Sequence, residues 1–168
     1  MSKVKNNQVM VSYRVDTFTS KVSVQPALIE ALDVILEAEG SELNGKQWCS
    51  KKAAFAKANG VKKVSAYVRE IATKKVLPKE AMASYSTDLK THDISYRING
   101  NGLSTTLTVG GALLHYIKQI TNGAAPTYLA KIASVFHDTK TDESNDISFL
   151  VRESIIQSAL ADRMAQAA

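Results

Sequence analysis

Apolar and polar positions follow the same order twice along this chain, first over residues 11–77 and again over residues 94–160. Each stretch opens on alternation, which is typical of a strand with one buried face; Val9, Val11, Tyr13 and Val15 alternate in the first stretch. Apolar residues then recur at helical spacing in three further segments of each stretch. The pattern predicts an α+β fold made of two tandem ββααα units.

The expected boundaries follow from turn and cap residues. In the first unit we expect strands at 9–15 and 21–25 around a turn at 16–20, followed by helices at 26–39, 45–59 and 65–77. In the second unit we expect strands at 94–98 and 106–109 around a hairpin turn at 99–102, followed by helices at 112–121, at 126–137 and from 148 to beyond 161. Residues 78–93 form a polar linker with a helical turn or two at 79–85, and residues 1–10 and 161–168 are tails.

Matching residues accompany the matching pattern. Ser12-Tyr13-Arg14-Val15 returns at residues 95–98, and Ser65-Ala66-Tyr67-Val68-Arg69-Glu70 corresponds to residues 148–153. Two copies of one unit in a chain can pack about a pseudo-two-fold axis, as the subunits of a homodimer do. We therefore expect a single-chain pseudo-dimer, one compact domain in a monomer, with further assembly open.

Composition narrows the function. With 45% apolar and 22% charged residues among 168, the chain has an ordinary globular composition, and no stretch is long and apolar enough to span a membrane. The single cysteine and an N-terminus without a signal-peptide core favour the cytoplasm. The chain has no metal-ligand spacing, phosphate loop or catalytic constellation, so we expect no enzyme activity, no metal and no cofactor.

Charge is unevenly placed along the chain. Residues 46–79 carry ten lysines and arginines against Glu70 alone, a field that favours a polyanionic partner, although a solvated lysine-rich helix face is the alternative. The corresponding part of the second unit carries Asp138, Asp142, Glu143 and Asp146. That flank is expected to avoid DNA, and it is a candidate surface for a protein partner.

A family resemblance joins these features. A short strand at residues 21–25, an amphipathic helix at 27–38 and a helix with Ser65, Val68, Arg69 and Glu70 resemble the ribbon-helix-helix DNA-binding proteins, here in the tandem single-chain form of DNA-transfer accessory proteins. The family implies that strands of two copies pair into one ribbon that enters the major groove of double-stranded DNA. The chain departs from the family in having an extra strand before the ribbon strand and residues 41–64, with an extra helix, between the two family helices.

The resemblance and the strand alternation together predict which residues would contact DNA. Side chains that point away from the core would read bases: Lys21, Ser23, Gln25, Thr106 and Thr108. Others would contact phosphates: Arg14, Arg97, Lys51, Lys52, Lys62, Lys63 and, as N-cap residues at helix starts, Ser65 and Ser148. For Arg69 and Arg152 an ion pair between the copies competes with a phosphate contact. The two outward sets differ, so the target site is at most an imperfect palindrome.

Other hypotheses remain open at this stage. Residues 55–61 followed by the helix at Ser65 also fit a helix-turn-helix in the first unit. Trp48, Phe55, Tyr128 and Phe136 are candidates for stacking on single-stranded bases, although helical spacing favours the core. The functional hypothesis is a transcriptional regulator or an accessory factor of a DNA-transfer complex. The alternative is a phage or mobile-element inhibitor module that binds a host nucleic-acid enzyme.

Overall fold

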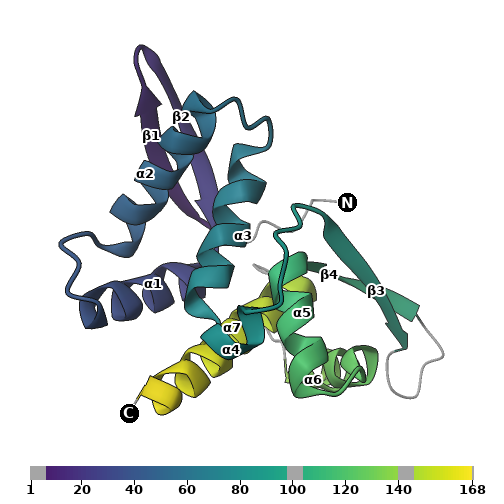
Figure 1. The fold of residues 1–168 in the computed structure, drawn as a ribbon. Helices are drawn as coiled ribbons and strands as arrows, with labels where there is room; N and C mark the ends of the chain where they lie inside the picture. The colour runs from purple at the N-terminus through teal and green to yellow at the C-terminus, as the bar shows by residue number, and fades with distance from the viewer. Residues whose placement is uncertain (1–6, 98–103, 140–145, 168) are drawn as a thin grey trace.

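The computed structural model describes residues 7–97, 104–139 and 146–167 (Figure 1). The fold is α+β, with two small antiparallel two-stranded sheets and seven helices in these ranges. The elements are β1 (Val9–Val15), β2 (Phe18–Val24), α1 (Pro26–Ala38), α2 (Gly45–Ala58), α3 (Val64–Val76), α4 (Lys79–Met82), β3 (Thr91–Arg97), β4 (Ser104–Gly110), α5 (Gly111–Ile120), α6 (Ala125–Thr139) and α7 (Ile147–Ala167). The α+β class is confirmed, and the elements fall in the expected order before and after α4. We call β1 to α3 the first half and β3 to α7 the second half.

Each half begins with a hairpin. In the first, Val11 lies opposite Val22, and both are buried against the helices, while Ser12 lies opposite Lys21 on the other face. The turn is shorter than the sequence predicts, because β2 already begins at Phe18 and Asp16 adopts a positive φ of 53° to close the hairpin. In the second hairpin Leu107 and Val109 are buried. The turn expected at residues 99–102 lies outside the described residues.

The two hairpins do not pair with each other. β2 pairs only with β1 and β4 only with β3 in the described part of the chain, and the hairpins extend from different sides of the helices (Figure 1). The shared ribbon that the family resemblance implies is therefore not formed. Instead, the additional strand of each half pairs with the strand that the family would use for the ribbon.

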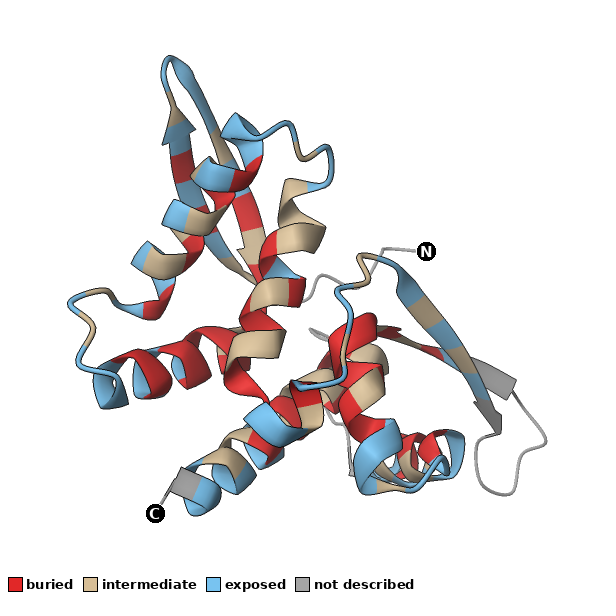
Figure 2. Ribbon diagram, viewed as in Figure 1, coloured by how far each residue is buried: buried red, intermediate tan, exposed pale blue. Residues whose placement is uncertain are grey.

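The helices form the interior. One continuous core includes residues from both halves, among them Leu32, Val68, Ile117 and Ile155, and the buried segments meet at the crossing of α3 and α7 (Figure 2). α1 packs on α7, and α5 packs on α3, so the first helix of each half lies on the last helix of the other. Ile120 is 47% exposed at the end of α5. In the described ranges no helix has the length and apolar character needed to cross a membrane.

Candidate functional site

The uncovered face of the β1–β2 hairpin carries polar and cationic side chains. Ser12 and Arg14 on β1 and Thr19 and Lys21 on β2 are exposed, and the register sets Ser12 opposite Lys21 and Arg14 opposite Thr19. Arg14 Nε donates to the carbonyl of Asp16 at 2.7 Å, which directs its guanidinium along the turn. The hairpin thus presents two cations and two hydroxyls on one antiparallel ribbon, and Lys21 is exposed as predicted.

Gln25 does not belong to this face. β2 ends at Val24, and the Gln25 side chain is only 7% exposed. Its Nε2 donates to Glu153 Oε1 at 2.9 Å, and its Oε1 accepts from Arg152 Nε at 2.7 Å. Both polar ends are engaged by the second half, so the prediction that Gln25 contacts bases is wrong. Ser23 is half-buried, with Arg69 Nη1 3.4 Å from its hydroxyl.

The second hairpin offers a different outer face. Thr106 is exposed, but Thr108 is half-buried, and its hydroxyl donates to Asp93 Oδ1 at 2.7 Å. Asp93 adds a negative charge where the first hairpin has none. Arg97 ends β3, and its side chain lies outside the described residues. The two outer faces therefore differ in charge, as the sequence predicts.

Several lysines on and after α2 lie next to the first hairpin, and we call them the lysine cluster: Lys51, Lys52, Lys57, Lys62 and Lys63. α2 packs on β1, and Ser50 Oγ donates to the carbonyl of Ser12 at 2.8 Å. Lys57 Nζ lies 4.5 Å from the centre of the Phe18 ring at the hairpin turn, and Lys52 Nζ lies 5.4 Å from that of Trp48. The cluster also holds three exposed lysines that form no ion pair within 4.0 Å to any described residue: Lys51, Lys62 and Lys63.

The candidate stacking aromatics separate into two groups. Trp48, Tyr128 and Phe136 are partly buried and pack against the core, as helical spacing favours. Phe55, on α2, is instead 58% exposed, so the expectation that it is a core residue is wrong.

The two serines do not cap their helices. α3 begins at Val64 with Lys63 as the N-cap residue, which leaves Ser65 at the second helical position. α7 begins at Ile147, and Asp146 Oδ1 accepts from the amide of Phe149 at 2.7 Å. A carboxylate already serves that helix start, so the phosphate contact predicted for Ser148 is wrong. The Ser148 hydroxyl instead accepts from the amide of Thr108 at 3.2 Å, tying α7 to β4.

Two glutamates cross between the halves. Glu153, on α7, accepts from the amide of Ala27 at 3.1 and 3.0 Å, and Glu70, on α3, accepts from the amide of Ala112 at 3.2 Å with each oxygen. Each carboxyl satisfies an amide in the first turn of the other half's first helix, where intrahelical acceptors are lacking. We call these contacts the reciprocal carboxylate caps. From the sequence we considered an arginine ion pair between the two halves and missed these contacts, although a glutamate follows the arginine in both halves.

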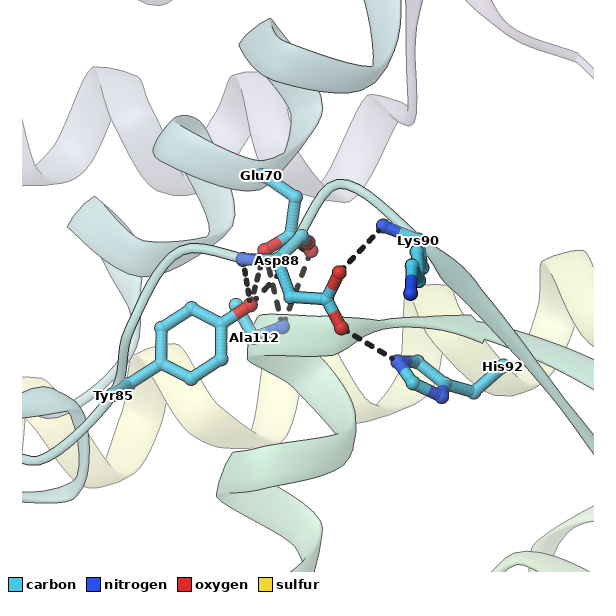
Figure 3. Close-up of polar contacts among 6 residues, drawn as sticks. All are labelled: Glu70, Tyr85, Asp88, Lys90, His92 and Ala112. Carbon is cyan, nitrogen blue, oxygen red and sulfur yellow. Dashed lines mark hydrogen bonds and ion pairs between the residues drawn. The ribbon is translucent and has the colours of Figure 1, made fainter.

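The surroundings of the two caps are not equivalent. Around Glu70, Tyr85 of the linker donates its hydroxyl to Oε2 at 2.7 Å, and Asp88 donates its amide to that hydroxyl at 3.0 Å (Figure 3). A Cβ on Gly110 would lie 2.8 Å from Glu70 Oε1, and one on Gly111 would lie 2.6 Å from the Tyr85 hydroxyl. Gly110 therefore leaves room for the Glu70 carboxyl, and Gly111 leaves room for Tyr85 of the linker. At the other cap, Gln25 takes the place of Tyr85 as the side-chain donor to Glu153.

Burial governs the protonation of both caps. Desolvation raises the pKa of Glu70, against the lowering effect of its hydrogen bonds to Tyr85 and Ala112. Desolvation likewise raises the pKa of Glu153, against its bonds to Gln25 and Ala27. In the same cluster His92 Nε2 lies 3.1 Å from Asp88 Oδ2 (Figure 3). We assign the caps a structural role, because every acceptor oxygen is directed at a protein donor.

The helix-turn-helix hypothesis fails on packing. Gly60 does adopt the positive φ of 78° that the turn between α2 and α3 requires. However, α3 packs against β2, α1, α2, α5 and α7, and Arg69 is its one exposed residue, so it presents no continuous exposed face to a DNA groove. In the described ranges no three His, Cys, Asp or Glu side chains are grouped to hold a metal ion.

Comparison with family models, curated proteins and solved structures found no match to this chain.

Proposed function

We propose that the protein binds double-stranded DNA through the outer face of the β1–β2 hairpin, as a transcriptional regulator or an accessory factor of a DNA-transfer complex. The observation that carries this proposal is the uncovered ribbon face with Arg14, Lys21 and two hydroxyl side chains. A two-stranded antiparallel ribbon fits the major groove of B-DNA. Because one hairpin is itself such a ribbon, pairing between the halves is not needed.

The chemistry of the face suits base edges. Arg and Lys pair with guanine O6 and N7, and Ser or Thr serves any base, each well-formed bidentate contact discriminating by about 1–3 kcal/mol. The unpaired lysines on and after α2 supply phosphate contacts beside the ribbon. Asp93 on the second hairpin repels phosphates, so the first half contributes most of the binding and the target is not a palindrome.

The pseudo-dimer is part of the proposal. We infer that the halves are copies of one ββααα unit folded about an approximate two-fold axis. The support is the same element order on both sides of α4, the packing of α1 on α7 and of α5 on α3, and the reciprocal carboxylate caps. In this arrangement one copy has kept a basic face while the other has become acidic.

The test is selection from a randomised duplex pool, followed by affinities at two salt concentrations. Lys21→Ala should weaken binding to the selected site and relax its sequence, by about five- to hundredfold if one base contact is lost. Lys118→Ala, at an exposed lysine near the end of α5, is the matched control and should change little. Equal effects from Lys21→Ala and Lys118→Ala would refute the assignment of base contacts to the hairpin.

A protein-binding module is the second candidate. Phe18 and Phe55 are 45% and 58% exposed within the basic half, and exposed aromatics between lysines suit an acidic protein surface. An inhibitor of a host nucleic-acid enzyme would have these features. Weak, wholly salt-driven DNA binding with no enriched sequence would favour this candidate over the first.

A further inference from the structure

A cavity of about 250 Å³ lies between the two halves. Its walls include Leu28 and Leu113, which hold corresponding positions in α1 and α5, and Arg69 and Arg152, which do so in α3 and α7. Because corresponding residues of both halves line the same cavity, we place it where the two halves face each other. The site is therefore distinct from the outer face of the hairpin.

The cavity is positively charged. Arg69, Arg152 and Lys90 line it, and Glu70 is the one carboxylate in the lining. The oxygens of Glu70 already accept from Tyr85 and Ala112. Neither arginine has a carboxylate within 4.0 Å in the described part of the chain.

The two guanidiniums differ in burial, since Arg152 is half-buried and Arg69 is exposed at the cavity. Desolvation lowers the pKa of Arg152, and the charge of Arg69 acts in the same direction, whereas the charges of Asp146 and Glu153 raise it. Desolvation also lowers the pKa of Arg69. Two like charges that line one cavity are stabilised by an anion between them, and the planar fork of an arginine matches phosphate oxygens.

Donors remain available for such an anion. Arg152 uses Nε for Gln25 and Nη1 for the carbonyl of Thr108, which leaves Nη2. Arg69 makes one long contact, 3.4 Å to Ser23. In addition, Gln8 lines the cavity with a buried Oε1 that has no hydrogen-bond partner among the described residues. That oxygen calls for a donor from the occupant, such as a hydroxyl.

We propose that this cavity binds a small phosphate-bearing anion, held by Arg69 and Arg152, with a ligand hydroxyl donating to Gln8. The proposal is independent of DNA binding by the hairpin. It does connect to both hairpins, because Arg69 contacts Ser23 of β2 and Arg152 contacts Thr108 of β4.

The test is isothermal titration calorimetry of the full-length protein in phosphate-free buffer at constant ionic strength. The probes are inorganic phosphate and glycerol 3-phosphate, which adds hydroxyls. We expect saturable binding at one site per chain, tighter for glycerol 3-phosphate, and about ten- to hundredfold weaker in Arg69→Gln. Gln8→Leu should abolish the preference for glycerol 3-phosphate.

Controls separate the cavity from the surface. Lys118→Gln removes an exposed cation of α5 outside the cavity and should leave the affinity unchanged, and circular dichroism checks that Arg69→Gln is folded. No saturable binding up to about 10 mM probe, or equal affinity in wild type and folded Arg69→Gln, would overturn the proposal. Displacement of the bound probe by duplex DNA would also overturn it, because the arginines would then serve the DNA backbone.

Discussion

Removal of the Glu70 carboxyl should destabilise the whole protein, although Glu70 is not part of the proposed DNA-binding face. Its side chain is 6% exposed and accepts from Ala112 and Tyr85. In Glu70→Ala the amide of Ala112, which is fully buried, loses its acceptor, and the hydroxyl of Tyr85 loses one partner. The change also opens space between α3 and α5.

The size of the effect follows from these losses. A buried amide left without an acceptor costs about 1–3 kcal/mol, and a hydrogen bond such as that of Tyr85 contributes about 0.5–1.5 kcal/mol. Loss of a carboxylate at a helix start adds about 0.3–1 kcal/mol. We expect the free energy of unfolding to fall by roughly 2–5 kcal/mol, which in a chain of this size lowers Tm by roughly 5–15 °C.

The assay is urea denaturation followed by circular dichroism at pH 7, with thermal denaturation beside it. Glu37→Ala on the exposed side of α1 is the matched control and should change the free energy of unfolding by no more than about 0.5 kcal/mol. Because Glu70 joins the halves, wild type should unfold in one transition. A Glu70→Ala protein as stable as Glu37→Ala would refute the reasoning, since it would show that the cap contributes nothing.

Three further predictions concern the same region and the core. Gly111→Ala places a Cβ against the Tyr85 hydroxyl, so the free energy of unfolding from thermal denaturation should fall by about 1–3 kcal/mol. The double variant with Tyr85→Phe should recover part of this stability, and no recovery would contradict the close approach. Since burial raises the pKa of Glu70 in the folded protein, the part of its stabilisation that depends on protonation is fully present below the unfolded value of 4.5 and is lost as pH rises through the folded value. Glu70→Ala should therefore destabilise more at about pH 4 than at about pH 8, and the opposite order would show that hydrogen bonding outweighs burial. Cys49 is fully buried, and burial raises the pKa of its thiol to about 12, so iodoacetamide should label it only on unfolding; labelling at the rate of a free thiol would contradict this burial.

The elements were predictable because their signals are local. Alternation from Val9 to Val15 and the placement of Pro26 and Gly40 around α1 depend on residues a few positions apart. The turn of the first hairpin was misplaced because Thr19 and Ser20, which are polar, belong to an exposed ribbon and not to a loop.

The errors at the site come from long-range contacts. Alternation was extended one residue past the end of β2, to Gln25, and only the approach of Arg152 and Glu153 shows that this side chain is buried. The glutamate caps were hidden for the same reason: Glu153 serves an amide 126 positions away, and periodicity carries no information about such pairs. The cavity lined by Arg69 and Arg152 could not be predicted either, because its walls come from both halves.

The reciprocal carboxylate caps bear on whether either half can exist alone. A cut between Ala83 and Ser84, both exposed, would leave each fragment with its own hairpin and three long helices but without the glutamate that serves its first helix. Each fragment would be incomplete, and each would carry what the other lacks. The protein is thus suited to split complementation, in which two separately expressed pieces regain their structure only on meeting.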